Sequence, residues 1–396
     1  MLISFSVKNF ASIKEKITLQ FAHMGKEEQS GLYFREHDLN FSKAVLIAGG
    51  NGSGKTNILK ALRFLIGFIS FSFYNKQPQL PYQTYFDDKS QLTELEIEFV
   101  FEKHRYRYIL HCSPTTVFYE ALFIKKSSFN FIFKRTWDPQ TEAYTISKKN
   151  HSDPVIQFTW PREAKLRNNA SLISTAVQFN QDFSVRLKAY FEKYQGNVDF
   201  LGKVDFDLAD VSKFYFENKD IKEQMSQLLS QLDLGLSAID VVKLNTPPTE
   251  KQEVYIPYGT HIVAGKSFNL GLAVESGGTR KLYTLCSAIL PALIQGSVVI
   301  IDELDAELHP MMVEKIVQLF LSERSNPHHA QLIFISHCLQ PLNMLDKEQI
   351  VLVEKDETLN TSAWHLSDTE DVRNDQNFLK KYLSGTYGAV PHIGLI

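Results

Sequence analysis

Apolar residues recur with different spacings along the chain, and the first 71 residues pass from strand-like to helical patterns. Residues 2–7 and 17–21 have strand-like apolar patterns, and Ala44–Ala48 is an unbroken apolar run that stops at glycines. Such a run is typical of a strand buried in a parallel sheet. Residues 57–71 then carry apolar side chains at helical spacing. The pattern predicts a β-rich start that ends in a buried strand, a glycine loop and a helix.

Aromatic and β-branched residues alternate with polar ones between residues 92 and 135. Polar turns interrupt the alternation at residues 102–103, 113–114 and 125–128, which predicts an antiparallel meander. The predicted strands cover residues 95–100, 106–111, 117–124 and 130–134, with candidate extensions at 144–147 and 155–160.

From about residue 161 to residue 236 the pattern becomes helical and more polar, without sustained heptads. Because a long coiled-coil arm requires such heptads, we expect none. The predicted helices cover residues 164–178, 182–193, 210–216 and 219–232.

The last third of the chain returns to an α/β pattern after a proline-containing break at residues 246–250. Strands are predicted over 253–257, around 261–268, and over Val298–Ile301, 332–335 and 350–353, and helices over 278–295 and Pro310–Leu321. We therefore expect an α/β protein in three parts. These are an N-terminal mixed-β lobe at residues 1–160, a helical insertion at 161–240 and a parallel α/β C-terminal lobe at 241–396.

Composition narrows the functional class. The 396 residues carry a formal net charge of -3, with 44% hydrophobic and 22% charged residues, which is a soluble globular balance without a global basic excess. The three cysteines are far apart, so neither a disulfide framework nor a zinc site is expected. No apolar stretch approaches 18 residues, and the N-terminus lacks a signal-peptide pattern. We expect a cytoplasmic protein without a membrane partner.

The glycine loop after the first buried strand fits the phosphate-binding pattern G-x-x-x-x-G-K-[ST]. Its glycines allow close backbone approach, so that successive N–H groups point at an anion, and the following helix adds its positive end. Lys55 would reach the β- and γ-phosphates of ATP, and the Thr56 hydroxyl would ligate Mg²⁺. The alternative is a chance match, which the correct strand and helix on either side disfavour. The predicted nucleotide-binding residues are Gly49, Asn51, Gly52, Ser53, Gly54, Lys55, Thr56 and Asn57.

The strand Val298–Ile301 is followed directly by two acids, Asp302 and Glu303. Four apolar residues and an acid at the end of a strand describe a Walker B site, in which Asp302 holds Mg²⁺. Glu303 would then orient or deprotonate the attacking water. The alternative is an ordinary buried strand that ends in solvated acids.

A second glycine turn, Ser276-Gly277-Gly278, opens another long predicted helix. Flexible backbone, a hydroxyl donor and a helix N-terminus again favour an anion, although a simple N-cap remains the alternative. Two such helix starts lie about 220 residues apart in one chain. An economical arrangement is two copies placed head to tail, each completing the nucleotide site of the other.

The order of these motifs resembles that of ABC-type ATPases, and in particular the branch that holds the SMC, RecF and OLD-family ATPases. The resemblance implies that ESGGTRK stands for the signature motif, so that Ser276, Gly277 and Gly278 contact nucleotide. It also implies that Asp305, in LDAELHP, is the D-loop aspartate. His337, in IFISH, would be the switch histidine that senses the γ-phosphate and joins Glu303 and Lys55 among the catalytic residues.

The match to that branch has two departures. The signature begins with Glu275 in place of leucine, and Thr279 replaces the usual Gln or Glu. The Q-loop glutamine has two candidates, Gln83 and Gln91.

Both ends of the chain resemble the compact AAA15 group, typified by RloA and AbiLii. The matching pieces are FSVKNFASI (residues 5–13), the glycine loop, the signature helix, IIDELDAELHP and the tail YLSGTYGAVPHI (residues 382–393). The resemblance implies a role in bacterial anti-phage defence. It implies a homodimer or larger homo-oligomer that controls a separately encoded effector, such as the TOPRIM-like nuclease of an RloB or PARIS system. DNA or a phage-encoded trigger would be a further ligand.

Competing interpretations remain at this stage. The purpose of ATP binding could instead be DNA clamping by a RecF-like repair ATPase, or switching of an unrelated protein partner. Without the resemblance, His337 would be interpreted as an ordinary histidine at the end of a strand. Cys338 is interpreted as an inert thiol. The aromatic residues of the meander are expected in sheet packing, with base stacking as the alternative.

Overall fold

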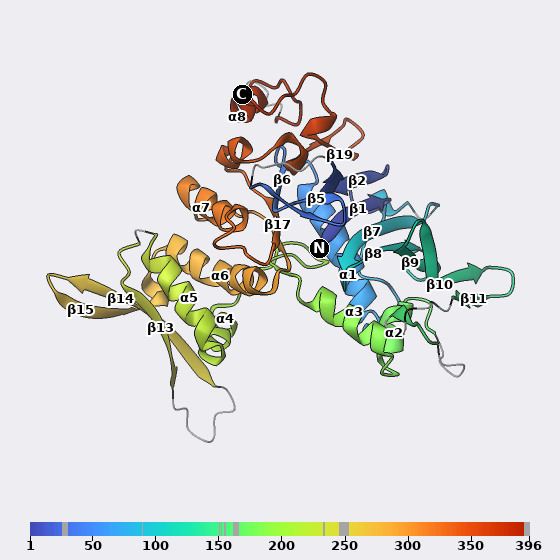
Figure 1. Ribbon diagram of the computed structural model, residues 1–396, viewed down its shortest axis with the longest axis horizontal. Helices are drawn as coiled ribbons and strands as arrows, with labels where there is room; N and C mark the ends of the chain where they lie inside the picture. The colour runs from blue at the N-terminus through green and yellow to red at the C-terminus, as the bar shows by residue number, and fades with distance from the viewer. Residues whose placement is uncertain are drawn as a thin grey trace.

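In the computed structural model, residues 1–25, 31–88, 90–149, 151, 153, 156–160, 166–232, 234–244 and 253–391 are described. Two large sheets form the body of the protein, and helix α1 (Lys55–Phe71) lies between them (Figure 1). The proline-containing break at residues 246–250 lies outside the described residues.

The central sheet holds the predicted apolar strands. Its strand order is β12-β16-β17-β6-β18-β19, and only the last pair, β18 with β19, is antiparallel. Every residue of β6, β16 and β17 is buried, as expected for strands covered on both faces. The bounds are β6 Ala44–Ala48, β12 Gln195–Gly196, β16 Val298–Ile301, β17 Gln331–Ile335, β18 Ile350–Lys355 and β19 Thr361–His365.

The second sheet is the predicted meander, extended by the N-terminus. It has seven strands in the order β11-β10-β9-β8-β7-β1-β2, and all of its neighbours are antiparallel. Its bounds are β1 Leu2–Lys8, β2 Ile17–Gln20, β7 Thr93–Phe101, β8 His104–Cys112, β9 Val117–Lys125, β10 Phe129–Asp138 and β11 Ala143–Lys148. Its apolar face and α1 share one core with Val45 and Ile47 of β6. A small sheet of β3 (Ala22–Met24), β5 (Leu39–Ser42) and β4 (Tyr33–Glu36) adjoins β1.

Residues 161–240 contain four described helices that pack in two places. Helices α2 (Leu172–Val177) and α3 (Asp182–Glu192) join the core of α1 and the antiparallel sheet. The chain then adds β12 to the central sheet before α4 (Leu208–Glu217) and α5 (Lys219–Ser230) pack near α6 in the second core. The residues expected to form one helical insertion therefore contribute helices to both cores and a strand to the central sheet. Residues 161–165 lie outside the described residues, and they include the first two positions of the helix predicted over 164–178.

The second core contains the other face of the central sheet, the long helix α6 (Gly277–Gln295) and α7 (Pro310–Leu321). The sheet β13-β14-β15 extends from it beside α4 and α5 (Figure 1), with bounds β13 Ala238–Leu244, β14 Val254–Val263 and β15 Lys266–Gly271. The C-terminal helix α8 (Phe378–Leu383) packs close to the 3-10 turn that follows β17.

The main differences from expectation lie in the first predicted helix and in short strands. Helix α2 covers only Leu172–Val177 of the predicted 164–178, and residues 166–171 are not helical. The strand predicted around 261–268 spans the turn between β14 and β15, and residues 156–160 form no strand. The expected α/β fold with a mixed-β N-terminal lobe and a parallel C-terminal lobe is confirmed. Within the described residues, no helix combines the length and the apolar character that a membrane span requires.

Candidate functional site

The glycine loop between β6 and α1 has no room for side chains at two of its glycines. A Cβ on Gly49 would lie 2.1 Å from the Val353 carbonyl oxygen, and one on Gly54, whose φ is 103°, would lie 2.1 Å from Thr361 Oγ1. The loop wraps a cavity of about 430 Å³. The cavity is lined by Asn51, Gly52, Ser53, Gly54, Lys55, Thr56, Asn57, Asp302, Glu303, Ile335, His337 and Lys355.

Lys55 lies in the first turn of α1, with its ammonium folded over the loop. Its Nζ donates to the carbonyl oxygens of Gly49 and Gly50, both at 2.8 Å. Burial lowers the pKa of the Lys55 ammonium, and the carboxylates of Asp302 and Glu303 oppose that shift. A buried cation whose hydrogen bonds go to carbonyl dipoles suits a phosphate, which supplies the opposite charge.

Thr56 and Asp302 meet where α1 begins and β16 ends. The Thr56 hydroxyl donates to Asp302 Oδ2 at 2.8 Å, and the Asp302 side chain is buried. Burial raises the pKa of the Asp302 carboxyl, while the hydrogen bond from Thr56 opposes this. The paired hydroxyl and carboxylate fit Mg²⁺, a hard cation that proteins bind through few carboxylates together with substrate phosphates.

Glu303 follows Asp302 and adopts a left-handed conformation with φ 51°, which turns the chain sharply after the strand. Its Oε2 accepts a hydrogen bond from Lys203 Nζ at 2.5 Å. This contact lowers the pKa of the Glu303 carboxyl below its ordinary value. His337 lines the same cavity, and its backbone N–H donates to Asp305 Oδ1 at 2.9 Å. The acids and the histidine predicted from sequence are therefore neighbours.

Ser276 caps the N-terminus of α6, since its Oγ accepts from the Thr279 N–H at 3.1 Å. A Cβ on Gly277 would lie 2.3 Å from Glu307 Oε2, so this glycine is closely covered by an acid of the same chain. Neither Ser276 nor the two glycines after it line the cavity of the glycine loop in this chain. The two predicted anion sites of one chain do not form one pocket.

The sequence from Val45 to Leu339 matches a family model described as "AAA domain, putative AbiEii toxin, Type IV TA system". The chain belongs to this AAA-domain family. The match runs from β6 past His337 and includes the glycine loop, the turn Ser276–Gly278 (called the signature turn below) and the acids Asp302 and Glu303 after β16. A search of curated proteins finds no match.

Similar solved structures include an SMC head bound to the C-terminal winged-helix domain of ScpA, at 14% identity and a TM-score of 0.48, covering 94% of this chain and 99% of that one. The SMC head domain from Thermotoga maritima matches at 13% identity and a TM-score of 0.45, covering 92% of this chain and 98% of that one. An SMC head from Pyrococcus furiosus, bound to a C-terminal domain of ScpA, matches at 12% identity and a TM-score of 0.46, covering 93% and 97% of the two chains.

Several residues at the site of this AAA-domain protein were not predicted from the sequence, because single polar residues in strands and loops form no pattern of their own. Asn197, after β12, holds the backbone of Asp302 from both sides, with its Oδ1 accepting from the N–H at 2.7 Å and its Nδ2 donating to the carbonyl at 2.9 Å. Thr361 of β19 donates to the Ser53 carbonyl at 2.9 Å, and Ser12 accepts from Asn57 Nδ2 at 2.8 Å. Lys355 lines the cavity.

The tail motif packs close to the glycine loop. A Cβ on Gly50 would lie 3.4 Å from Pro391, and the Ala389 N–H donates to Glu354 Oε2 at 3.1 Å. Residues 392 and 393 of the motif lie outside the described residues.

The remaining candidates from sequence take no part in the cavity. Gln83 and Gln91 are exposed and do not line it, although their carbonyls accept from Ala11 N and Asn9 Nδ2 at 2.8 Å each. Burial raises the pKa of the Cys338 thiol, as expected for an inert cysteine. Among the described residues, no group of three or more His, Cys, Asp or Glu side chains could hold a metal ion.

Proposed function

We propose that this AAA-domain protein binds ATP with Mg²⁺ at the glycine loop and hydrolyses it. One observation carries the proposal: Thr56, at the start of α1, bonds to Asp302, at the end of β16, and Glu303 follows on the rim of the same cavity. Thr56 and Asp302 are 246 residues apart in sequence, so their meeting is a property of the fold.

In the proposed reaction, water attacks the γ-phosphorus, the bond from that phosphorus to the bridging oxygen breaks, and ADP leaves with the oxygen. Glu303 accepts the proton of the attacking water. Lys55 and the glycine-loop N–H groups stabilise the charge on the phosphate oxygens. Thr56 and Asp302 would hold Mg²⁺, which supplies further charge neutralisation when bound.

We further propose that two copies close around ATP, with Ser276, Gly277 and Gly278 of each copy acting on the nucleotide of the other, while Asp305 and His337 lie between the halves. In support, the signature turn opens a 19-residue helix but does not line the cavity of its own chain. If Ser276–Gly278 were to contact the nucleotide bound by their own chain, α6 would have to move a long way, although it is packed in the second core.

The biological role we propose is the ATPase of a bacterial defence module, closing on ATP to control a separately encoded effector of TOPRIM-like nuclease type. The family description, which names a putative toxin of a type IV system, supports a role of this class. The tail that packs beside the glycine loop supports the AAA15-like assignment, because a family-specific segment there can respond to nucleotide.

The test of the chemistry is Glu303→Gln, compared with Glu142→Gln, which changes an exposed glutamate between β10 and β11, outside the cavity lining. We expect Glu303→Gln to keep ATP affinity, to lose at least about 100-fold in hydrolysis rate and to accumulate an ATP-dependent dimer in size-exclusion chromatography with light scattering. Hydrolysis at the wild-type rate would exclude Glu303 as the base.

The test of the role is co-purification of the Glu303→Gln protein with the product of the neighbouring gene, with and without ATP. Retention of a nuclease-like partner supports the proposal. ATP-dependent, salt-sensitive binding of duplex DNA by the chain alone would favour a repair ATPase instead.

A further inference from the structure

A short turn outside the recognised motifs reaches Glu303. Residues 198–203, called the Lys203 turn below, follow β12, and Val198 and Lys203 pair as an antiparallel bridge. Lys203 Nζ donates to Glu303 Oε2 at 2.5 Å. Glu303 lines the nucleotide cavity but Lys203 does not, so the ion pair holds one carboxylate oxygen of Glu303 to a residue outside the cavity lining.

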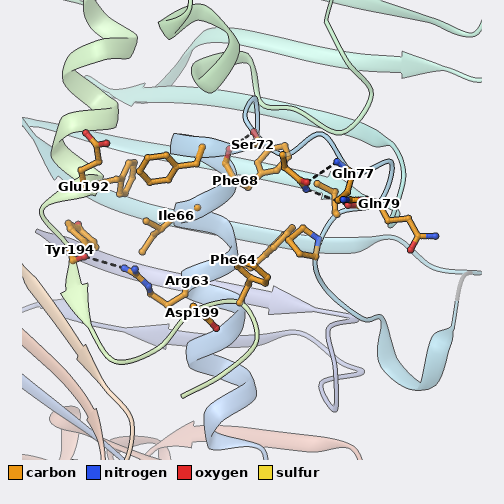
Figure 2. Close-up of a pocket in the computed structure, with 17 residues that line it drawn as sticks. Arg63, Phe64, Ile66, Phe68, Ser72, Gln77, Gln79, Glu192, Tyr194 and Asp199 are labelled. Atoms are coloured by element: carbon orange, nitrogen blue, oxygen red, sulfur yellow. Dashed lines mark hydrogen bonds between the residues drawn. The ribbon is translucent and has the colours of Figure 1, made fainter. Parts of the chain in front are cut away.

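The base of the Lys203 turn is firmly held. Asn197, directly before it, is bonded to both backbone groups of Asp302. On the other side, Arg63 of α1 donates from Nε to the Val198 carbonyl at 2.9 Å and from Nη1 to the Tyr194 carbonyl at 3.3 Å. Figure 2 shows Arg63 directed toward Tyr194, near Asp199, at a second cavity of about 830 Å³.

The tip of the turn is open. Phe200 and Leu201 are 41% and 75% exposed, and the tip turns through Gly202, whose φ of 134° suits a glycine. Lys203 lies at this held base, opposite Val198, and the Val204 N–H donates to the Asn197 carbonyl at 2.8 Å. The Lys203 side chain can therefore leave Glu303 by rotating, without disturbing β12 or Asp302.

We propose that Lys203 is a positioning residue that restrains Glu303, and that ATP hydrolysis requires this ion pair to open. The inference rests on the proposed function, in which Glu303 is the base. While Oε2 accepts from the Lys203 ammonium group at 2.5 Å, the Glu303 carboxylate is held toward Lys203 and cannot turn freely toward an attacking water. The Glu303 side chain is 44% exposed, and ion pairs this exposed are weak, so the restraint can open and close in each cycle.

The test compares Lys203→Met, which keeps the stem and removes the charge, with Lys203→Arg, which keeps the charge. We expect Lys203→Met to raise kcat for ATP about two- to five-fold, the range that an exposed ion pair allows, with KM changed less than two-fold. Lys203→Arg should behave like the wild type. A fall in kcat, or no change, would overturn the inference.

A second measurement needs no turnover. Hydrogen exchange of the nucleotide-free proteins should show faster exchange at residues 199–204 in Lys203→Met than in wild type and Lys203→Arg, because the turn has lost its tether to Glu303. Equal exchange in all three proteins would contradict a restraint. If Glu303→Gln hydrolyses at the wild-type rate, the proposed base fails; if that variant is inactive and Lys203→Met is not faster, only the restraint fails.

Discussion

Two clusters in this protein use the same kinds of side chains in opposite ways. In the antiparallel sheet, Glu120 and Arg135 are fully buried with 3.1 Å between their charged atoms, and Tyr108 donates to Glu120 Oε1 at 2.7 Å. At the nucleotide site, Lys55 and Asp302 line an open cavity of about 430 Å³.

The partners of the charges explain the difference. Glu120 also accepts from the Leu172 N–H at 2.8 Å, and Arg135 donates to the carbonyl oxygens of Ala170 and Arg167 at 2.6 and 2.9 Å. These contacts tie the sheet to the start of α2. Lys55, in contrast, bonds to carbonyl dipoles of its own loop and faces the cavity. A charge neutralised within the chain stabilises the fold, whereas a charge that faces a cavity is available to a ligand.

The largest expected effect comes from breaking the buried cluster. Arg135→Met leaves the Glu120 carboxylate buried without its counter-charge, and we expect the free energy of unfolding to fall by about 3–5 kcal/mol. Urea unfolding followed by circular dichroism measures this change.

The matched control is the double variant Glu120→Gln/Arg135→Met, which removes both charges and keeps an acceptor for the Leu172 N–H. It should regain a large part of the lost stability, because the uncompensated charge is gone. A loss below about 1 kcal/mol in the single variant would contradict the structural role that we assign to this pair.

At Lys55 we expect a substitution to reduce ATP binding and to leave the stability of the fold almost unchanged. Lys55→Met keeps the buried stem and removes the charge, so the free energy of unfolding should change by less than about 1 kcal/mol. ATP affinity should fall at least about 100-fold, because the phosphates lose a buried cationic partner. Lys55→Ala should likewise abolish nucleotide binding.

Isothermal titration calorimetry measures the affinity, and Lys60→Met, on the same helix but outside the cavity lining, is the control. Unchanged ATP affinity in the Lys55 variants would refute the nucleotide assignment.

The same comparison explains what could be predicted from the sequence. The strands Ala44–Ala48 and Val298–Ile301 were predicted with their observed bounds, because an apolar run that ends in glycines or acids is a local signal. The Thr56–Asp302 contact follows from those two runs, since the parallel strands of an α/β sheet bring their carboxyl ends to one edge, although β17 lies between β6 and β16. Short strands such as β3 and β19 depend on their partners and left no such signal.

Contacts made by single side chains from distant turns could not be predicted. Asn197 and Lys203 reach the Walker B acids across 105 and 100 residues, and nothing in their surrounding sequence marks them. Glu120 and Arg135 occupy polar positions in alternating strands, which normally indicate a solvated face. Both side chains bond to the segment that leads into α2, at residues 167–172, and contacts with so distant a segment leave no local pattern.

The smallest expected effect concerns a partly exposed pair, His261 and Glu275, the latter directly before the turn Ser276–Gly278. His261 of β14 bonds through Nε2 to Glu275 Oε1 at 2.7 Å, and this contact raises the pKa of His261. A histidine with a raised pKa in the folded state stabilises the protein below its unfolded pKa of about 6.5 and loses that contribution as pH rises through the folded value. The pair is partly exposed, so we expect His261→Gln to lower the free energy of unfolding by no more than about 1 kcal/mol at pH 6. The difference from wild type should shrink toward zero by about pH 8.5. Urea midpoints at the two pH values measure it, and a difference that is the same at both would show that the contact with Glu275 is not an ion pair.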